Sequence, residues 1–129
     1  MTQIADVMRP DFIEVAPEDT LGEVAERMTA KNVGAVVVKD FGTLIGILTE
    51  RDLLKAMAAR VHSSEARVRQ WMTADPVTAS TDTDVEEASR VMLEHGFRHL
   101  PVLDDEGQVA GVVSLRRVVG ATQPARDPA

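Results

Sequence analysis

The sequence contains no cysteine. Without cysteine a chain can form no disulfide framework, and any metal site must do without thiolate ligands. Long apolar runs are missing as well, since a stretch such as Ala35–Val38 is far too short to span a bilayer. The first twenty residues hold several acidic side chains and lack the apolar segment of a secretory signal. We therefore expect a soluble protein of the cytoplasm that makes no membrane contact.

Basic residues and aromatic rings are also scarce. Lys and Arg number 14 against 21 Asp and Glu, which gives a formal net charge of -7. Binding to the phosphate backbone of nucleic acid depends on clustered Lys and Arg, so this balance argues against it. Three Phe and one Trp are the only aromatic residues, too few for a platform that stacks single-stranded bases. We expect no nucleic acid partner.

What the chain does contain is an internal repeat. A shift of 64 residues aligns the following identical pairs: Met8 with Met72, Asp11 with Asp75, Glu23 with Glu87, Met28 with Met92, Val38 with Val102 and Asp40 with Asp104. After one extra loop residue, a shift of 65 aligns Gly42, Gly46 and Arg51 with Gly107, Gly111 and Arg116. Such a register, kept over most of the chain, indicates a repeated unit. We divide the chain into repeat 1 (1–62), repeat 2 (63–121) and a loose tail (122–129).

Each repeat predicts the same order of strand, helix, strand, strand and helix. For repeat 1 the elements are an extended segment at 12–16, a helix capped by Thr20 and Glu23, strands at 35–39 and 44–48, and a helix from Thr49. For repeat 2 they are a helix capped by Asp84 and Glu87, strands at 100–103 and 109–113, and a helix from Ser114. The paired strands are almost wholly apolar, which favours burial of both faces. The pattern predicts a mixed α/β fold.

Three segments of this pattern resemble a known family. Val7-Met8 and Trp71-Met72 are similar to its lead-in, and residues 96–104 to its second-strand motif. Residues 46–52 match its ligand motif of Gly, two apolar residues, Thr or Ser, two variable residues and Asp. The chain thus resembles a tandem pair of cystathionine-β-synthase (CBS) domains, or Bateman module, of the standalone bacterial type. The resemblance covers almost the whole chain.

The resemblance implies a fold and a function. Two β-α-β-β-α repeats would pack sheet to sheet about a pseudo-twofold axis and leave two clefts between them. Related modules bind AMP, ADP, ATP, NAD or S-adenosylmethionine in these clefts and commonly form homodimers. A regulatory module of this kind is no enzyme and requires no cofactor. We therefore expect an adenosine nucleotide as ligand and an unidentified protein partner that receives the signal.

Thr49 and Asp52 have two interpretations. At a strand-to-helix junction they form a T-x-x-D capping box, which needs no ligand. The same helix N-terminus also suits a phosphate, and a carboxylate can accept hydrogen bonds from ribose hydroxyls. The resemblance implies the second role, with Thr49 on phosphate, Asp52 on ribose and Ile47 within the motif. In repeat 2 the motif departs from the family, because Arg117 follows Ser114 where the ribose-binding Asp is expected.

Arg98 and His99 open the second strand of repeat 2. Without the resemblance they are polar residues at a strand edge, although His can gain a proton near neutral pH. In related modules cations at these positions contact the nucleotide phosphate, and the family's clefts are shared between repeats. Asp52 would then face Val77 and Thr78, with Arg98 and His99 beyond them. The resemblance therefore predicts one complete site, and a second, degenerate cleft around Ser114 and Arg117.

Other functions have less support in the sequence. His62, His95 and His99 show no metal-ligand spacing, phosphate-binding glycine loops are missing, and no residue pattern indicates an activated nucleophile. A ligand-free interaction domain with vestigial clefts remains the alternative. Apolar residues on the closing helices predict a homodimer in either case; they include Leu53, Leu54, Met57, Val118 and Val119.

Overall fold

The structure of the protein, a computed structural model, describes residues 2–122. The chain forms two compact units. We call residues 11–76 the central unit; the terminal unit combines residues 2–10 with residues 77–122. Of the predicted tail, Thr122 is instead the last residue of a helix, and 123–129 lie outside the described residues.

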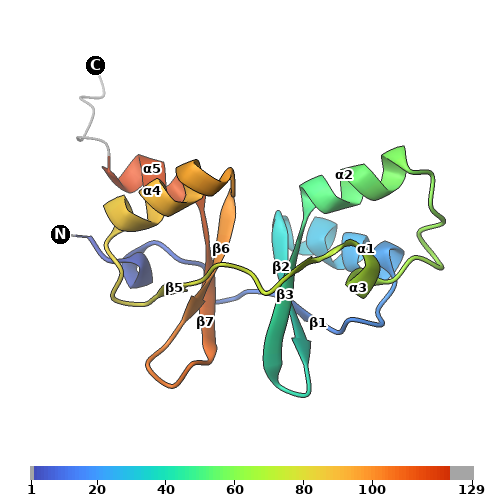
Figure 1. Cartoon of the computed structure of the whole chain (residues 1–129), viewed down its shortest axis with the longest axis horizontal. Coiled ribbons are helices and arrows are strands. Elements are labelled where there is room, and N and C mark those ends of the chain that lie inside the picture. The colour runs from blue at the N-terminus through green and yellow to red at the C-terminus, as the bar shows by residue number, and fades with distance from the viewer. Residues whose placement is uncertain (1, 123–129) are drawn as a thin grey trace. The chain divides into compact units, whose positions relative to one another are not determined.

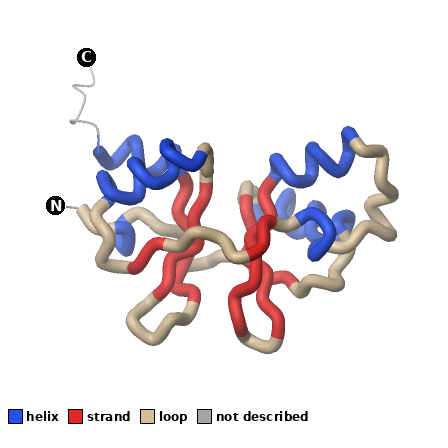
Figure 2. Tube along the Cα trace, in the orientation of Figure 1, coloured by secondary structure: helices blue, strands red, loops and turns tan. Residues whose placement is uncertain are grey.

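The central unit is a four-stranded sheet with three helices (Figures 1 and 2). Its strands are β1 (Glu14–Val15), β2 (Ala35–Asp40), β3 (Thr43–Thr49) and β4 (Thr73–Ala74), in that order across the sheet. Its helices are α1 (Leu21–Lys31), α2 (Glu50–Ala58) and α3 (Val68–Trp71). Strand β1 runs parallel to β2, whereas β2–β3 and β3–β4 are antiparallel.

The terminal unit repeats this plan with a smaller sheet. Its elements are the 3-10 helix η1 (Ile4–Asp6), strands β5 (Ala79–Ser80), β6 (His99–Leu103) and β7 (Val109–Ser114), and helices α4 (Val85–His95) and α5 (Leu115–Thr122). Strand β5 is parallel to β6, and β6 is antiparallel to β7, as in the central unit. The predicted mixed α/β class and the twofold repetition of its elements are confirmed. The packing of one repeat against the other stays a prediction.

Each compact unit takes its lead-in segment from the other repeat. Residues 2–10, which begin repeat 1, belong to the terminal unit, where Arg9 forms a bridge with Val112 of β7. The equivalent segment of repeat 2 belongs to the central unit and contributes α3 and β4, the latter paired with β3. Ile4 is fully buried in the terminal core, and Val68, its equivalent at a shift of 64, is fully buried in the central core. The sequence division at residue 62 gave no sign of this exchange.

Helix α1 begins as the sequence predicts. Thr20 is its N-cap, and the hydroxyl Oγ1 accepts a hydrogen bond from the N–H of Glu23 at 3.2 Å. Leu21, Val24 and Met28 are buried on the inner face and pack with apolar residues of β2 and β3. Capping and the apolar stripe together fix this helix against the sheet.

The predicted cap of helix α4 is wrong. Asp84 stands at the N-cap but makes no capping hydrogen bond. The helix instead has its first N–H, that of Val85, bonded to the carbonyl of Thr2 at 3.1 Å. Glu87, the expected partner of Asp84, is held by Arg90 at 2.6 Å. The lead-in segment therefore satisfies the first N–H of this helix, a donor that an N-cap side chain does not serve.

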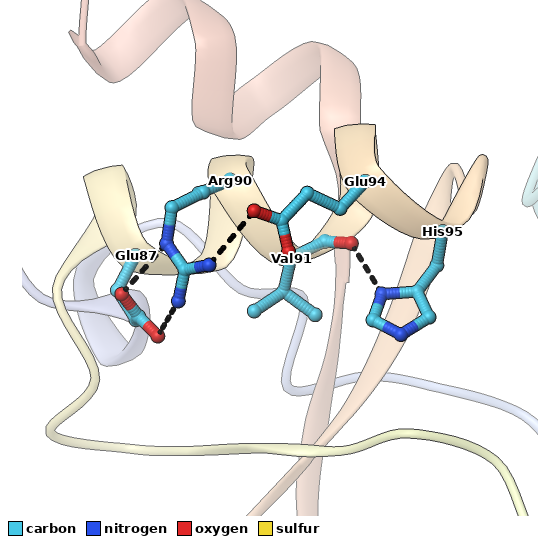
Figure 3. Close-up of polar contacts among 5 residues, drawn as sticks. All are labelled: Glu87, Arg90, Val91, Glu94 and His95. Atoms are coloured by element: carbon cyan, nitrogen blue, oxygen red, sulfur yellow. Dashed lines mark hydrogen bonds and ion pairs between the residues drawn. The ribbon is translucent and has the colours of Figure 1, made fainter.

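A row of polar contacts runs along the exposed side of α4 (Figure 3). Arg90 lies between Glu87 and Glu94, with ion pairs of 2.6 and 2.9 Å. The hydrogen bonds that Arg90 donates to Glu87 and Glu94 favour its charged form and raise the pKa of Arg90. At the end of the helix, His95 contacts the carbonyl of Val91 through Nδ1 at 2.9 Å. Contacts this exposed contribute little to folding stability.

Residues 2–122 contain neither a membrane-spanning helix nor a cluster of metal-ligating side chains. No helix in this range combines the length and apolar character needed to cross a bilayer. Within the same residues, no three carboxylates or imidazoles gather as a metal ion would require.

Candidate functional site

The motif at residues 46–52 forms the junction between β3 and α2. Thr49 ends the strand with extended backbone and is the N-cap of the helix. Asp52, in the first helical turn, is only 9% exposed. Its Oδ2 accepts hydrogen bonds from the N–H of Thr49 at 2.9 Å and from the Thr49 hydroxyl at 3.2 Å. Ile47, two residues earlier on β3, is buried.

This geometry leaves part of Asp52 for a ligand. Both contacts with Thr49 use the same oxygen, Oδ2. The other oxygen, Oδ1, makes no hydrogen bond with any residue in the described range. A carboxylate has about four acceptor positions, so a held carboxylate with one unused oxygen can accept from hydroxyl groups of a ligand. The cap and the binding role therefore coexist in one side chain.

The first backbone N–H of each closing helix is already used. In α2 the N–H of Glu50 donates to the carbonyl of Gly34 at 3.0 Å. In α5 the N–H of Leu115 donates to the carbonyl of Arg98 at 2.7 Å. A phosphate at either helix would find fewer free donors than the sequence suggests, which makes cationic side chains nearby more important.

In the terminal unit the same junction lacks a carboxylate. The Ser114 hydroxyl accepts a hydrogen bond from the N–H of Arg117 at 3.3 Å, so serine alone caps α5. The side chain of Arg117 is exposed and forms no ion pair within residues 2–122. This end of the helix can attract an anion but offers no carboxylate to accept from both hydroxyls of a ribose.

Strand register places the other predicted residues at one end of the terminal sheet. His99 is opposite Ser114 in the β6–β7 pair. Because β5 runs parallel to β6, with Ala79 beside Val102, the preceding residues Val77 and Thr78 lie toward the start of β6. Arg98, just before that start, is exposed and has no ion pair among the described residues, while His99 is half-buried.

The corresponding sheet ends of the two units differ in charge. The central unit carries Asp52, with uncharged Gly34 and Ala35 where the terminal unit has Arg98 and His99. The structure thus groups Ile47, Thr49 and Asp52 in one unit, and Val77, Thr78, Arg98 and His99 in the other. That both groups serve one ligand stays a prediction.

Gly46, the first residue of the ligand motif, is required by close packing that the sequence did not reveal. A Cβ at Gly46 would lie 2.6 Å from Sδ of Met72 and 3.0 Å from the carbonyl oxygen of Thr73. At Gly111, the equivalent position, a Cβ would lie 2.7 Å from the carbonyl oxygen of Arg9. Because neither glycine has a side chain, the lead-in segment of the other repeat can pack directly against the strand.

Comparison with known proteins identifies a family. The family model for the CBS domain matches residues 4–59 and again residues 68–123. An uncharacterized 17.7 kDa protein of Acidianus ambivalens is 36% identical over 121 residues, which are 93% of this chain and 73% of that protein. A CBS-domain protein of Agrobacterium tumefaciens, known from its crystal structure, has a TM-score of 0.85 at 35% identity and covers 95% of this chain and 100% of its own.

Similar solved structures contain adenosine ligands. CBSX2, a CBS-pair protein of Arabidopsis thaliana, was crystallised with AMP; it has a TM-score of 0.75 at 28% identity, over 94% of this chain and 96% of its own. The CBS pair of protein MJ0100 was crystallised with methylthioadenosine and S-adenosylmethionine; its TM-score is 0.82 at 26% identity, over 95% of this chain and 99% of its own. The cytosolic domain of the Mg²⁺ channel MgtE was crystallised with ATP; its TM-score is 0.75 at 30% identity, over 92% of this chain and 48% of its own.

Proposed function

The chain belongs to the CBS domain family, and from this premise we propose that it is a regulatory module that senses an adenosine-containing nucleotide. The observation that carries the proposal is the position of Asp52, held at the α2 cap through Oδ2 while Oδ1 has no partner in the described part of the chain. Related structures that contain AMP, ATP or S-adenosylmethionine support the ligand class. The shared part of these ligands is adenosine, so the ribose is the group to expect at Asp52.

The proposal assigns a role to each group of the ligand. Asp52 accepts from the ribose hydroxyls through Oδ1, and the Thr49 hydroxyl donates to a phosphate when its single proton turns from Oδ2 of Asp52 to the ligand. Arg98 and His99 supply positive charge for the phosphates, while the apolar side chains of Ile47 and Val77 and the polar Thr78 contact the rest of the nucleotide. None of these roles breaks a covalent bond, and the output passes to a protein partner.

A second candidate function rests on the surface of α2. Leu54 and Met57 are 66% and 74% exposed, although both are large and apolar. Such side chains on one helix favour an interaction domain that acts without a ligand. The two functions differ in one observable property, which is whether an adenosine ligand stabilises the fold.

A thermal-shift screen against AMP, ATP, NAD and S-adenosylmethionine tests this difference. A ligand at about 100 times its Kd stabilises the folded state by about 2.7 kcal/mol. For a chain of 129 residues this corresponds to a Tm rise of roughly 8–15 °C. We expect such a rise with at least one of the four ligands. The nucleotide-sensing proposal fails if none of them raises the Tm at millimolar concentration.

We also expect the protein to form a homodimer through α2. Leu54 and Met57 would be covered by a second copy. Val118, predicted from the sequence to be available for this contact, is instead fully buried in its own core. Leu54→Glu should place a charge in this interface and yield a monomer in sedimentation or light scattering at micromolar concentration.

Lys55→Glu is the matched control for this experiment. Lys55 is exposed on the same helix, and its substitution changes the net charge by more than Leu54→Glu does, yet it removes no apolar surface. The Lys55→Glu protein should remain dimeric. A wild-type chain that is monomeric under these conditions contradicts the prediction.

A further inference from the structure

The turn between β2 and β3 places an aromatic residue where turn chemistry disfavours one. Phe41 and Gly42 are its two central residues, with φ of 50° and 80°, between the paired residues Asp40 and Thr43. Positive φ at both positions defines a type I′ turn, for which Asn-Gly, Asp-Gly and Gly-Gly are favoured. A bulky residue with positive φ is strained, because its Cβ approaches the backbone too closely.

The equivalent turn in the terminal unit shows that the fold does not require Phe41. There Asp105 occupies the matching position, at a shift of 64. The side chain of Asp104 accepts hydrogen bonds from the N–H groups of Glu106 and Gln108, both at 2.9 Å, and Gly107 supplies the positive φ. That turn is polar and satisfies its own backbone groups, as a solvent-exposed hairpin should.

The exposure of Phe41 to water is a second unfavourable feature, in addition to its backbone conformation. Phe41 is 100% exposed, so its ring packs against nothing in the described chain. The protein has only three Phe and one Trp, and the other three are partly buried. A residue that breaks the local turn rule and also leaves an aromatic ring in water is a mark of a functional position. Exposed aromatic side chains commonly anchor protein interfaces.

The charges beside Phe41 indicate what kind of surface it meets. Lys39 is bound to Glu14 at 2.9 Å, which neutralises the one basic residue of this hairpin. Asp40 is exposed and has no ion pair among residues 2–122. Asp75 is also exposed, and its N–H is bonded to the carbonyl of Ile45 at 3.1 Å on the same hairpin. The charge next to the ring in sequence is therefore the negative charge of Asp40, with that of Asp75 farther along the same hairpin.

This arrangement argues against two of the possible occupants. The exposed Asp40, next to Phe41 in sequence, is repelled by an anionic bilayer, which binds basic segments. A second copy of the chain offers little for the ring, since the other exposed large apolar side chains of the described residues are Leu54 and Met57 on α2, Leu93 on α4, and Val77.

We propose that the β2–β3 turn docks a protein partner, with the Phe41 ring in an apolar pocket whose rim carries Lys or Arg opposite Asp40. This inference rests on the proposed function in one respect, which is that the module acts through a protein partner. The free energy gained by burying the ring would offset the backbone strain at φ 50° and the cost of exposing the ring to water in the free protein. Nucleotide binding is expected to be independent of this turn.

The test begins with the photo-crosslinking analogue p-benzoylphenylalanine at position 41 of the full chain, in the cells that naturally make the protein. A chain with the same analogue at position 105, in the equivalent turn, is the control. We expect a protein adduct that is specific to position 41. Its identity then allows the partner to be purified and its Kd for the unmodified chain to be measured by calorimetry.

Phe41→Asn supplies the decisive measurement. Asparagine accepts the left-handed conformation, so the variant should fold normally with a Tm higher by about 2–5 °C. Its Kd for the purified partner should rise roughly 30-fold, as for removal of an interface anchor, while Asp105→Asn leaves the Kd unchanged. The nucleotide-induced Tm rise of Phe41→Asn should equal that of the wild type, which separates this inference from the proposed function.

Three results would overturn the proposal. One is no adduct above the level of the position-105 control. Another is an adduct with a lipid or with a second copy of the chain. The third is a partner whose Kd is the same for Phe41→Asn and for the wild type.

Discussion

Replacing Asp52 with alanine is expected to remove most of the thermal stabilisation that an adenosine ligand gives. The substitution deletes Oδ1, the oxygen proposed to accept from the ribose, and Oδ2, which orients the Thr49 hydroxyl. A hydrogen bond to a charged group contributes about 1.5–3 kcal/mol, so affinity should fall roughly 10- to 100-fold. Calorimetry and thermal shift at a fixed ligand concentration measure this loss.

A second effect of Asp52→Ala appears without ligand. Oδ2 accepts the N–H of Thr49 at 2.9 Å, and loss of such a cap costs about 1 kcal/mol of folding stability. Asp52→Asn separates the two effects, because its amide oxygen can still accept from Thr49 while the charge is gone. That variant should keep most of the intrinsic stability and bind the ligand more weakly than the wild type.

Arg117→Ala is the matched control in the terminal unit. Arg117 occupies the position equivalent to Asp52, and its side chain is exposed. Because its removal deletes no ribose acceptor, ligand affinity should stay almost unchanged. Two equal binding sites per chain, or equal losses for Asp52→Ala and Arg117→Ala, would contradict a single site built on Asp52.

The largest loss of folding stability is expected for Gly111→Ala. The added Cβ would lie 2.7 Å from the carbonyl oxygen of Arg9 and 2.8 Å from Sδ of Met8. A backbone oxygen cannot swing away, so the lead-in segment must leave the edge of β7 or the strand must distort. Overpacking of this kind costs about 1–3 kcal/mol, and we expect the upper end of that range. Urea unfolding should show the transition at a lower concentration.

Gly46→Ala should have a smaller effect for a definite reason. Its nearest neighbour is Sδ of Met72, at 2.6 Å, the flexible part of a side chain. In a Met72→Ala background the loss should shrink further, since only the oxygen of Thr73, at 3.0 Å, remains close. Gly120→Ala is the control, because nothing lies within 4 Å of its added Cβ. A Gly111→Ala protein as stable as Gly120→Ala would disprove this account of the lead-in contact.

The sequence was sufficient for most of the regular elements. Thr20 with Glu23 marked the start of α1, and the apolar segments marked β2, β3, β6 and β7, because capping and apolar runs are local properties. The ligand motif likewise located Thr49 and Asp52 at one strand-to-helix junction. Local pattern and tertiary structure agree at these positions.

Contacts between distant segments were not predictable in the same way. Met8 and Met72 are identical and precede equivalent repeats, so either could pack on either glycine, and the exchange follows only from the three-dimensional contacts. Asp84 makes no capping hydrogen bond, and the contact at this helix end, from the N–H of Val85 to the carbonyl of Thr2, joins residues far apart in sequence. At Phe41 the sequence showed only a turn, while its exposure and φ required coordinates.

The exchanged lead-in segments have a consequence for synthesis on the ribosome. The central unit is continuous in sequence, from 11 to 76, so all of its segments are present once residue 76 has emerged. Ile4 and Arg9 emerge before it, but their partners on β7 and in the terminal core are made about a hundred residues later. At about 5–20 residues per second, the first ten residues must stay unfolded for roughly 5–20 s while about a hundred more are added. Among the described residues, the segment made earliest is therefore among the last to find its partners.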